Sequence, residues 1–230
     1  MRTIGLLHGM SSAATGDYYR RINDGVNAAL GGHERAQMLV WSVNFGDVER
    51  FVRGDRWEAA ADYLVDKALR LERAGADFLV CGSNTMHRVA PAIEAATEVP
   101  FLHIVDVLAD AALRGGARTL GVLGTRPTME AAFYAERLAL HGIAAIVPDA
   151  DDRDLVDRVI FDELTRHELR DDSKAEYIRV ITGLAEAGAD AVVLGCTEIG
   201  LLVDQSDVPD IPLLDTTELH VERIVRFALE

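Results

Sequence analysis

Two segments of the sequence carry residues that could move a proton. Cys196 stands in "GCTEIG" (195–200) and Ser83 in "CGSNTMH" (81–87), each at the point where an apolar run ends. A thiol beside the N-terminal amides of a helix is expected to have a lowered pKa, because those amides favour the thiolate. We therefore expect a catalytic role for Cys196, although a lone cysteine is also a common apolar filler. Cys81 lies within the apolar run, and we expect it to be structural.

Four segments of small and hydroxyl residues follow apolar runs, at 8–12, 83–87, 124–130 and 195–200. Free backbone N–H groups and hydroxyls at a helix start bind carboxylate or phosphate. Serine, threonine and asparagine are also ordinary N-caps that need no ligand, so one such segment alone shows little. Four of them favour an anion site. None has the glycine spacing of a P-loop or a dinucleotide-binding motif, which disfavours a nucleotide.

Other polar side chains near these segments have two interpretations each. Glu198 is either an acid in the site or a first-turn carboxylate that matches the helix dipole. His8 and His87 either reach a ligand or pack inside the protein. The histidines form no HxxxH pattern and the cysteines no CxxC pattern, so we expect no metal. The arginines that could neutralise a second substrate carboxylate, or only cover a surface, are Arg50, Arg53, Arg56 and Arg126.

The elements that position these segments follow from the hydrophobic pattern. Short apolar runs rich in Val, Ile and Leu alternate with longer amphipathic stretches, which is typical of βα units and predicts an α/β fold with parallel sheets. We expect strands at 2–8, 37–43, 77–82, 101–105, 119–124, 143–147, 190–195 and 211–214. We expect helices at 12–30, 56–74, 88–97, 106–114, 128–141, 151–166, 173–187 and 216–229.

The sequence contains an internal repeat. "LERAGADFLVCGSNT" (71–85) matches "LAEAGADAVVLGCTE" (184–198), so that Ser83 and Cys196 occupy matching positions. "TIGLLHG" matches "TLGVLGT" at nearly the same offset, and "VPF" loosely matches "IPL". The repeat predicts two related α/β domains, 1–104 with 215–230 and 105–214. Ligands commonly bind in the cleft between such domains, at the carboxyl ends of the strands, where Ser83 and Cys196 are expected to face one another.

The composition limits the partners. The chain of 230 residues has a formal net charge of −15, which disfavours nucleic acid and anionic membranes because both bind basic surfaces. Local groups must therefore hold any anionic substrate. The start "MRTIGLLHGM" is expected to be a strand and not a signal peptide. With two cysteines and no disulfide framework, we expect the reduced cytoplasm.

Five motifs occur in order along nearly the whole chain: "HGM", "SNTMH", "GTRPTMEAAFY", "DELTRHELRDDSKAEY" and "GCTEIGLL". Together they resemble the cofactor-independent aspartate/glutamate racemase family, and especially its broad-specificity amino-acid racemase branch. The resemblance implies two pseudo-symmetric Rossmann-like domains, commonly a homodimer, and racemisation of a small anionic amino acid without pyridoxal phosphate or metal. It implies acid/base residues at Ser83 and Cys196 and substrate-binding residues at Met10, Asn84, Thr85, Thr125, Thr128 and Thr197.

The sequence departs from the family pattern at both of its first two motifs. Many members have cysteine where this chain has Ser83, and many have "GGM" where it has "HGM". A serine hydroxyl is a poor base without a partner, so we expect Ser83 to be the proton donor or an orienting hydroxyl and Cys196 to be the base. Such an unequal pair is expected to process one enantiomer better than the other.

Two alternative functions remain open at the level of sequence. Relatives with one thiol decarboxylate malonates or isomerise unsaturated diacids, so the same scaffold is expected to support either reaction. A non-catalytic amino-acid-binding module is the other alternative, in which the anion site is kept and turnover is lost.

Overall fold

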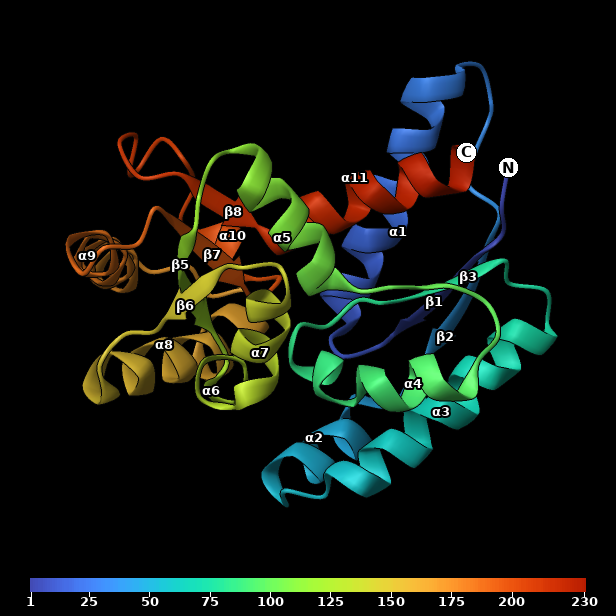
Figure 1. Ribbon diagram of the computed structural model, residues 1–230, viewed down its shortest axis with the longest axis horizontal. Coiled ribbons are helices and arrows are strands. Elements are labelled where there is room, and N and C mark those ends of the chain that lie inside the picture. The colour runs from blue at the N-terminus through green and yellow to red at the C-terminus, as the bar shows by residue number, and fades with distance from the viewer. The chain divides into compact units, whose positions relative to one another are not determined.

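The computed structural model describes residues 1–230, and the chain divides into two compact units, Met1–Ile104 with His220–Glu230 and Val105–Leu219 (Figure 1). Each unit contains a four-stranded sheet, and every strand pair in both sheets is parallel. The predicted α/β class with parallel sheets is therefore confirmed. The domain boundaries expected from the sequence stay a prediction, which the division of the chain into two units supports.

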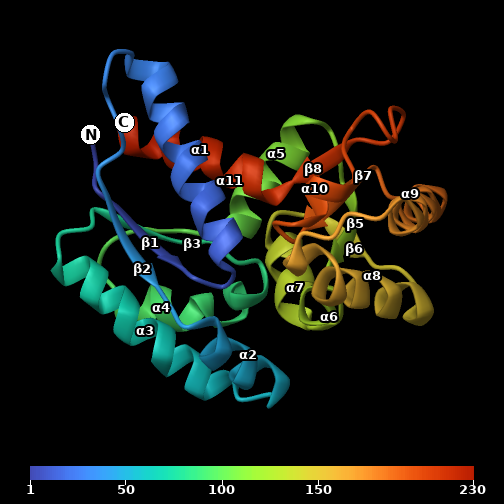
Figure 2. The ribbon, with the colours of Figure 1, turned by 180° about the vertical axis from the view of Figure 1, so that it is seen from behind.

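The first sheet has the strand order β2-β1-β3-β4. Its strands are β1 (Ile4–His8), β2 (Met38–Ser42), β3 (Phe78–Cys81) and β4 (Phe101–Leu102). Figure 2 shows α1 (Ser12–Leu30) and α11 (Thr216–Leu229) on one face of this sheet and α3 (Trp57–Arg73) and α4 (Ala90–Ala96) on the other. Alternate strand residues supply the two cores: Leu6 packs with α1 and α11, and Leu7 packs with α3 and α4.

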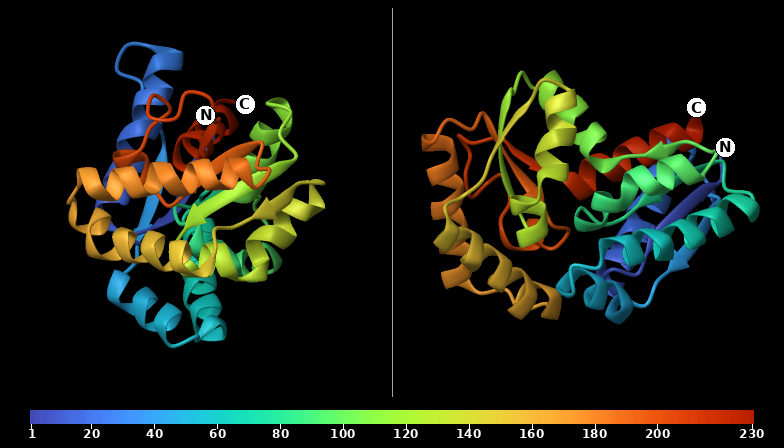
Figure 3. Two further views of the ribbon diagram at one scale, coloured as in Figure 1. Left: turned by 90° about the vertical axis from the view of Figure 1, so that its left-hand side faces the viewer. Right: turned by 60° about the horizontal axis from the view of Figure 1, so that its bottom comes forward.

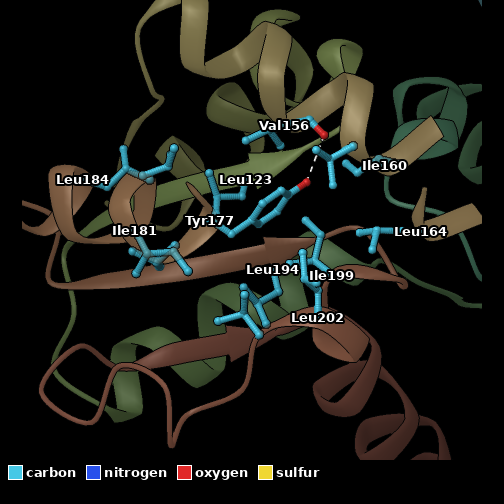
Figure 4. Packing of buried hydrophobic residues seen from close by; sticks show 14 of the residues in the cluster. Leu123, Val156, Ile160, Leu164, Tyr177, Ile181, Leu184, Leu194, Ile199 and Leu202 are labelled. Atoms are coloured by element: carbon cyan, nitrogen blue, oxygen red, sulfur yellow. Dashed lines mark hydrogen bonds between the residues drawn. The ribbon is translucent and has the colours of Figure 1, made fainter. Parts of the chain in front are cut away.

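The second sheet repeats this topology with the order β6-β5-β7-β8. Its strands are β5 (Thr119–Gly124), β6 (Ala144–Ile146), β7 (Ala191–Gly195) and β8 (Leu213–Asp215). Figure 3 shows α8 (Ala150–Asp162) and α9 (Asp171–Glu186) on one side of this sheet, and α5 (Ile104–Arg114) and α7 (Ala132–Leu140) on the other. Tyr177 of α9 lies at the centre of the larger core, and its hydroxyl donates to Val156 O at 2.9 Å (Figure 4).

The internal repeat has a structural counterpart at the start of each sheet. Asp77 accepts a hydrogen bond from Thr3 N at 2.6 Å, and Asp190 accepts one from Thr119 N at 2.8 Å. The helix that precedes each aspartate ends in the same way, with Gly75 at φ 99° and Gly188 at φ 100°. Glycine is favoured there because a side chain is strained at positive φ. The two "GAD" segments of the repeat therefore form the same turn, once in each unit.

The helices differ from the expectation at several points. α2 (Phe45–Arg53) was not expected. The helix expected at 128–141 is two, α6 (Arg126–Glu130) and α7, because Ala131 between them is extended with ψ 141°. Short helices complete the chain, namely the 3₁₀ turns η1 (Thr85–Val89) and η2 (Leu164–Arg166) and the single turn α10 (Ile199–Leu202). No helix combines the length and apolarity that crossing a membrane requires.

Candidate functional site

The Ser83 segment leaves β3 and turns directly into η1. Ser83 is partly buried, and its Oγ accepts a hydrogen bond from Met86 N at 3.4 Å. His87 is buried and donates from Nδ1 to Ser83 O at 2.7 Å, while its Nε2 accepts from Ile104 N at 3.2 Å. The His87 ring therefore fixes the backbone of Ser83 and does not reach for a ligand.

Asn84 and Thr85 lie on the same turn as Ser83. Asn84 is buried, and its carbonyl accepts from His87 N at 3.1 Å. Thr85 is partly buried and begins η1. Cys81, just before the turn, packs in the core that faces α3, and burial raises the pKa of its thiol to about 12. The expectation that Cys81 is structural is confirmed.

The first segment, after β1, turns at a glycine. Gly9 has φ 97°, and a Cβ at this position would overlap the backbone of Val43. Both observations require glycine. Met10 is partly buried against the α3 side of the core. Ser11 then caps α1 and accepts from Ala14 N at 3.1 Å.

His8, at the end of β1, is buried inside the first unit. Its ring contacts Tyr18 edge-on at 5.0 Å between centroids. Burial, with a smaller contribution from His220, lowers the pKa of His8 to about 3, so the ring is neutral. Its Nε2 is buried and has no hydrogen-bond partner. An unpaired buried polar group costs about 1–3 kcal/mol, so this atom is an exception in the fold.

The Cys196 segment follows β7 and places a thiol against a carboxylate. Cys196 is partly buried, and its Sγ donates to Glu198 Oε2 at 3.1 Å. Thr197 Oγ1 donates to the same oxygen at 2.5 Å. Glu198 is itself buried, with 6% of its surface exposed. It is therefore part of the hydrogen-bond network of the Cys196 segment, and it also stands at the start of α10, so both interpretations from the sequence stay open.

The expected lowering of the Cys196 pKa is wrong. Burial raises the pKa of this thiol well above its ordinary value, and the negative charge of Glu198 raises it further. The backbone N–H of Glu198 also reaches the sulfur and lowers the pKa, but it is outweighed. The helix that follows, α10, has only four residues, so few aligned amides oppose the two larger effects.

Thr125 and Thr128 lie where β5 leads into α6. Their hydroxyl oxygens are 3.2 Å apart. Thr128 is buried, and its Cγ2 lies 3.0 Å from the point that a Cβ at Gly124 would occupy. Thr125 precedes α6 but makes no side-chain capping bond to it. Thr128 therefore packs against the turn at Gly124. A direct contact with substrate stays a prediction for both threonines.

The sequence-predicted residues gather in two groups, one in each unit. In the first unit Ser83, Asn84 and Thr85 follow β3, and Met10 follows the adjacent strand β1. In the second unit the group at the ends of the paired strands β5 and β7 comprises Thr125, Thr128, Cys196 and Thr197. Gly82 is a residue that the sequence did not single out, and its contact with His8 is described below.

The four candidate arginines have other contacts, and Arg56 Cζ lies 5.6 Å from the centroid of the Phe51 ring. Arg50 pairs with Asp47, and Arg53 with Glu49 at 2.9 Å. Arg126 pairs with Asp154. No group of three or more His, Cys, Asp and Glu side chains converges as metal ligands do.

Known proteins resemble the chain over almost its whole length. A protein-family model described as Asp/Glu/Hydantoin racemase matches residues 7–224. A crystal structure from Yersinia pestis, described as a candidate Asp/Glu racemase, is 42% identical, covers 100% of both chains and has a TM-score of 0.94. An aspartate racemase homologue from Pyrococcus horikoshii is 30% identical, again over 100% of both chains, with a TM-score of 0.87. The broad-specificity amino-acid racemase RacX of Bacillus subtilis is 25% identical over 218 residues, which is 93% of this chain and 92% of RacX.

Proposed function

Because the chain belongs to the Asp/Glu/Hydantoin racemase family, we propose that it racemises acidic amino acids by removing and returning the α-proton, without pyridoxal phosphate. The observation that carries the proposal is the Cys196 thiol, which stands at the carboxyl end of a parallel strand and donates to a buried carboxylate. Ser83 holds the matching position after β3 in the other copy of the repeat. Racemisation needs two such groups, one for each face of the α-carbon.

Cys196 is proposed as the base, and Glu198 as the group that prepares it. A thiol with a raised pKa rests protonated, so it must lose its proton before it can accept another. Glu198 Oε2 accepts the hydrogen bond of this thiol and takes that proton. The thiolate then removes the α-proton: the C–H bond breaks, an S–H bond forms, and the electron pair stays on the α-carbon and spreads into the substrate carboxylate.

Ser83 is proposed as the donor on the opposite face. Its hydroxyl proton passes to the α-carbon, a proton from water restores the hydroxyl, and Glu198 releases the proton that it took from Cys196 to the hydroxide left behind, so that each residue regains its starting state. Asn84, Thr85, Thr125 and Thr197 are proposed to hold the substrate carboxylate. Their hydrogen bonds gain strength as charge builds up on that carboxylate, which lowers the barrier and not only the binding energy.

Isotope exchange tests the proposal. The purified protein is incubated in deuterated water with each enantiomer of aspartate and of glutamate, and loss of the α-proton signal is followed by NMR. We expect exchange with at least one substrate and its loss in Cys196→Ala. Cys81→Ala is the matched control, because it removes the other thiol and is expected to retain exchange. If the wild type exchanges no α-proton, or Cys196→Ala exchanges as fast as the wild type, the proposal fails.

Decarboxylation is the second candidate function, and the protonation state of Cys196 favours it. A decarboxylase for malonate-type diacids needs one group that protonates a carbanion, and a thiol that rests protonated supplies this without Glu198.

A cis–trans isomerase of unsaturated diacids needs one nucleophilic thiol. Carbon dioxide release from substituted malonates and isomerisation of maleate separate these reactions from racemisation. Calorimetric binding of an amino acid with no turnover would indicate a non-catalytic binding module.

The finer expectations on assembly and location stay predictions. A homodimer follows from the resemblance, and a cytoplasmic location from the two free cysteines. Light scattering of the purified protein tests the first, and fractionation of the source cells tests the second.

A further inference from the structure

The turn that carries Thr125 and Thr128 leads into a helix that another helix caps. A threonine just before a helix ordinarily accepts a hydrogen bond from an N–H of the first turn through its hydroxyl oxygen. Thr125 makes no such bond to α6. The first N–H of α6 instead has a carboxylate from α8 as its acceptor, since Arg126 N donates to Asp157 Oδ1 at 2.6 Å.

Asp157 is the contact through which α8 holds the backbone of α6. Two side-chain pairs also join the helices, Arg126 with Asp154 and Arg153 with Glu130 at 2.9 Å. The first of these pairs is exposed, with 47% and 62% of the side-chain surfaces accessible, and exposed pairs contribute little. Asp157 is partly buried and binds a backbone N–H, and such charge-assisted hydrogen bonds are among the stronger ones. Asp157 therefore fixes where α6 begins.

The place where α6 begins matters because it lies beside the thiol. β5 and β7 pair in parallel as far as Gly124 and Gly195, so Thr125 and Cys196 are the next residues on the two strands. A Cβ at Gly124 would lie 3.0 Å from Gly195 O, so the strand ends are in close contact. Burial is the largest cause that raises the pKa of Cys196, and the negative charges that raise it further include that of Asp157. The carboxylate thus lies close enough to act on this segment.

We propose that Asp157 is a positioning residue: by accepting from Arg126 N, it holds Thr125 Oγ1 where that hydroxyl binds the substrate carboxylate. Because α8 supplies the acceptor, the hydroxyl of Thr125 is not required as the cap of α6. Precise placement is needed at this point, since a displacement of about 1 Å can cost on the order of a hundredfold in rate. The effect on turnover rests on the proposed function, whereas the anchoring of α6 does not.

Proton NMR tests the anchoring without reference to activity. In protein with labelled arginine, the Arg126 N–H resonance, identified by its absence in Arg126→Lys, is expected at low field, because a short hydrogen bond deshields the proton. Asp157→Ala is expected to move it to higher field and to speed its exchange with solvent. Asp157→Asn keeps an acceptor oxygen and is expected to move it less. Asp154→Ala is the matched control on the same helix and is expected to leave it in place. A resonance that does not respond to Asp157→Ala overturns the inference, and so does an equal response to Asp154→Ala.

Kinetics test the role in catalysis. Asp157→Ala is expected to lower kcat for racemisation by about ten- to a hundredfold, with a smaller change in KM. The reason is that the hydrogen bonds of Thr125 to the substrate carboxylate gain strength in the transition state. Asp157→Asn is expected to recover much of the loss, and Asp154→Ala to keep the wild-type rate. Unchanged kcat in Asp157→Ala would contradict the assignment.

A double variant separates positioning from a general structural role. In the Thr125→Ala background the hydroxyl that Asp157 positions is absent, so Asp157→Ala is expected to have only a small further effect. An equal loss in both backgrounds would show that Asp157 only supports the fold, and would overturn the inference. If the wild type neither racemises an acidic amino acid nor exchanges its α-proton, the proposed function fails, and the Arg126 resonance still decides on the anchoring.

Discussion

At the scale of single residues, the thiol of Cys196 depends on the carboxylate beside it. Glu198 accepts from both Cys196 and Thr197, and its charge is one of the two main causes that raise the pKa of the thiol. The carboxylate thus has two opposite effects. It holds the proton on sulfur, and in the proposed mechanism it is also the acceptor that takes this proton.

Glu198→Gln separates these two effects. Removing the negative charge is expected to lower the pKa of Cys196, so alkylation of the thiol by iodoacetamide at pH 8 becomes faster. Removing the acceptor is expected to slow α-proton exchange by about 10²–10⁴-fold. The measurements are the alkylation rate against pH and the exchange rate. Slower alkylation together with unchanged exchange would contradict the assignment of Glu198.

The contact between His8 and Gly82 predicts a compensating pair of substitutions. Gly82→Ala places a Cβ inside the His8 ring, and such overpacking typically destabilises a fold by about 1–3 kcal/mol. His8→Gly removes the ring, so the double variant is expected to regain part of the loss that Gly82→Ala causes alone. Urea unfolding of the four proteins measures the coupling. Strictly additive effects would show that the ring can move aside.

At the scale of elements, α11 is attached to the first sheet through a buried histidine. His220 Nδ1 accepts from Tyr18 OH of α1 at 3.1 Å, and its Nε2 donates to Leu102 O of β4 at 3.1 Å. Burial lowers the pKa of His220 to about 4. In the neutral ring Nε2 carries the hydrogen that is donated to Leu102 O, so Nδ1 is the acceptor of the Tyr18 hydroxyl.

The neutral state of His220 makes the stability of the first unit depend on pH. Above the unfolded pKa of about 6.5 neither state binds the proton, and the contribution to stability is fully present. Below it the unfolded chain binds a proton that the folded chain refuses, so stability falls as pH falls from 6.5 towards 4. The slope for one group is at most about 1.4 kcal/mol per pH unit. His220→Gln is expected to have a smaller slope by up to this amount in urea unfolding.

The exposed His33 provides the control for the pH experiment. His33→Gln is expected to leave the pH slope of the unfolding free energy unchanged. If His220→Gln keeps the wild-type slope between pH 6.5 and 4, the buried neutral state is not the source of the acid sensitivity.

Most elements, and the strand ends at which the two candidate groups lie, could be predicted from the sequence because their signals are local. All eight strands appear near their expected positions, since buried parallel strands are continuous apolar runs. The missed α2 has an N-cap at Asn44, a stop at Gly54 and apolar residues at helical spacing, so its signal is present in the sequence and was overlooked. The break at Ala131 has no local signal, because alanine favours helix and only packing makes it extended there.

The chemistry of the site was less predictable than its position. The family and the racemase class are confirmed by the matched residues 7–224. The protonation state of Cys196 was predicted wrongly, because neither the burial of the sulfur nor the approach of Glu198 can be read from "GCTE". The packing of His8 against Gly82 joins two segments 74 positions apart in the numbering, and no pattern in either segment signals it.

At the scale of the whole molecule, the net charge of −15 opposes the approach of an anionic substrate. Screening by salt weakens this repulsion, since the Debye length falls from roughly 30 Å at 0.01 M to about 8 Å at 0.15 M ionic strength. We therefore expect the KM for aspartate or glutamate to fall as salt rises over this range. A neutral amino acid, where accepted, is the control and is expected to keep its KM. A rise in KM with salt would mean that a local positive site dominates the encounter.

The return of His220–Glu230 to the first unit has a consequence for how the protein is made. Arg2 N donates to Ala228 O at 2.8 Å, and Ile224 and Ala228 fill the core under β1. A ribosome delivers those residues after the whole of Val105–Leu219 has emerged. During synthesis the second unit therefore has all of its residues while the first still lacks the last eleven of its own, so the unit that begins later is the first to be complete.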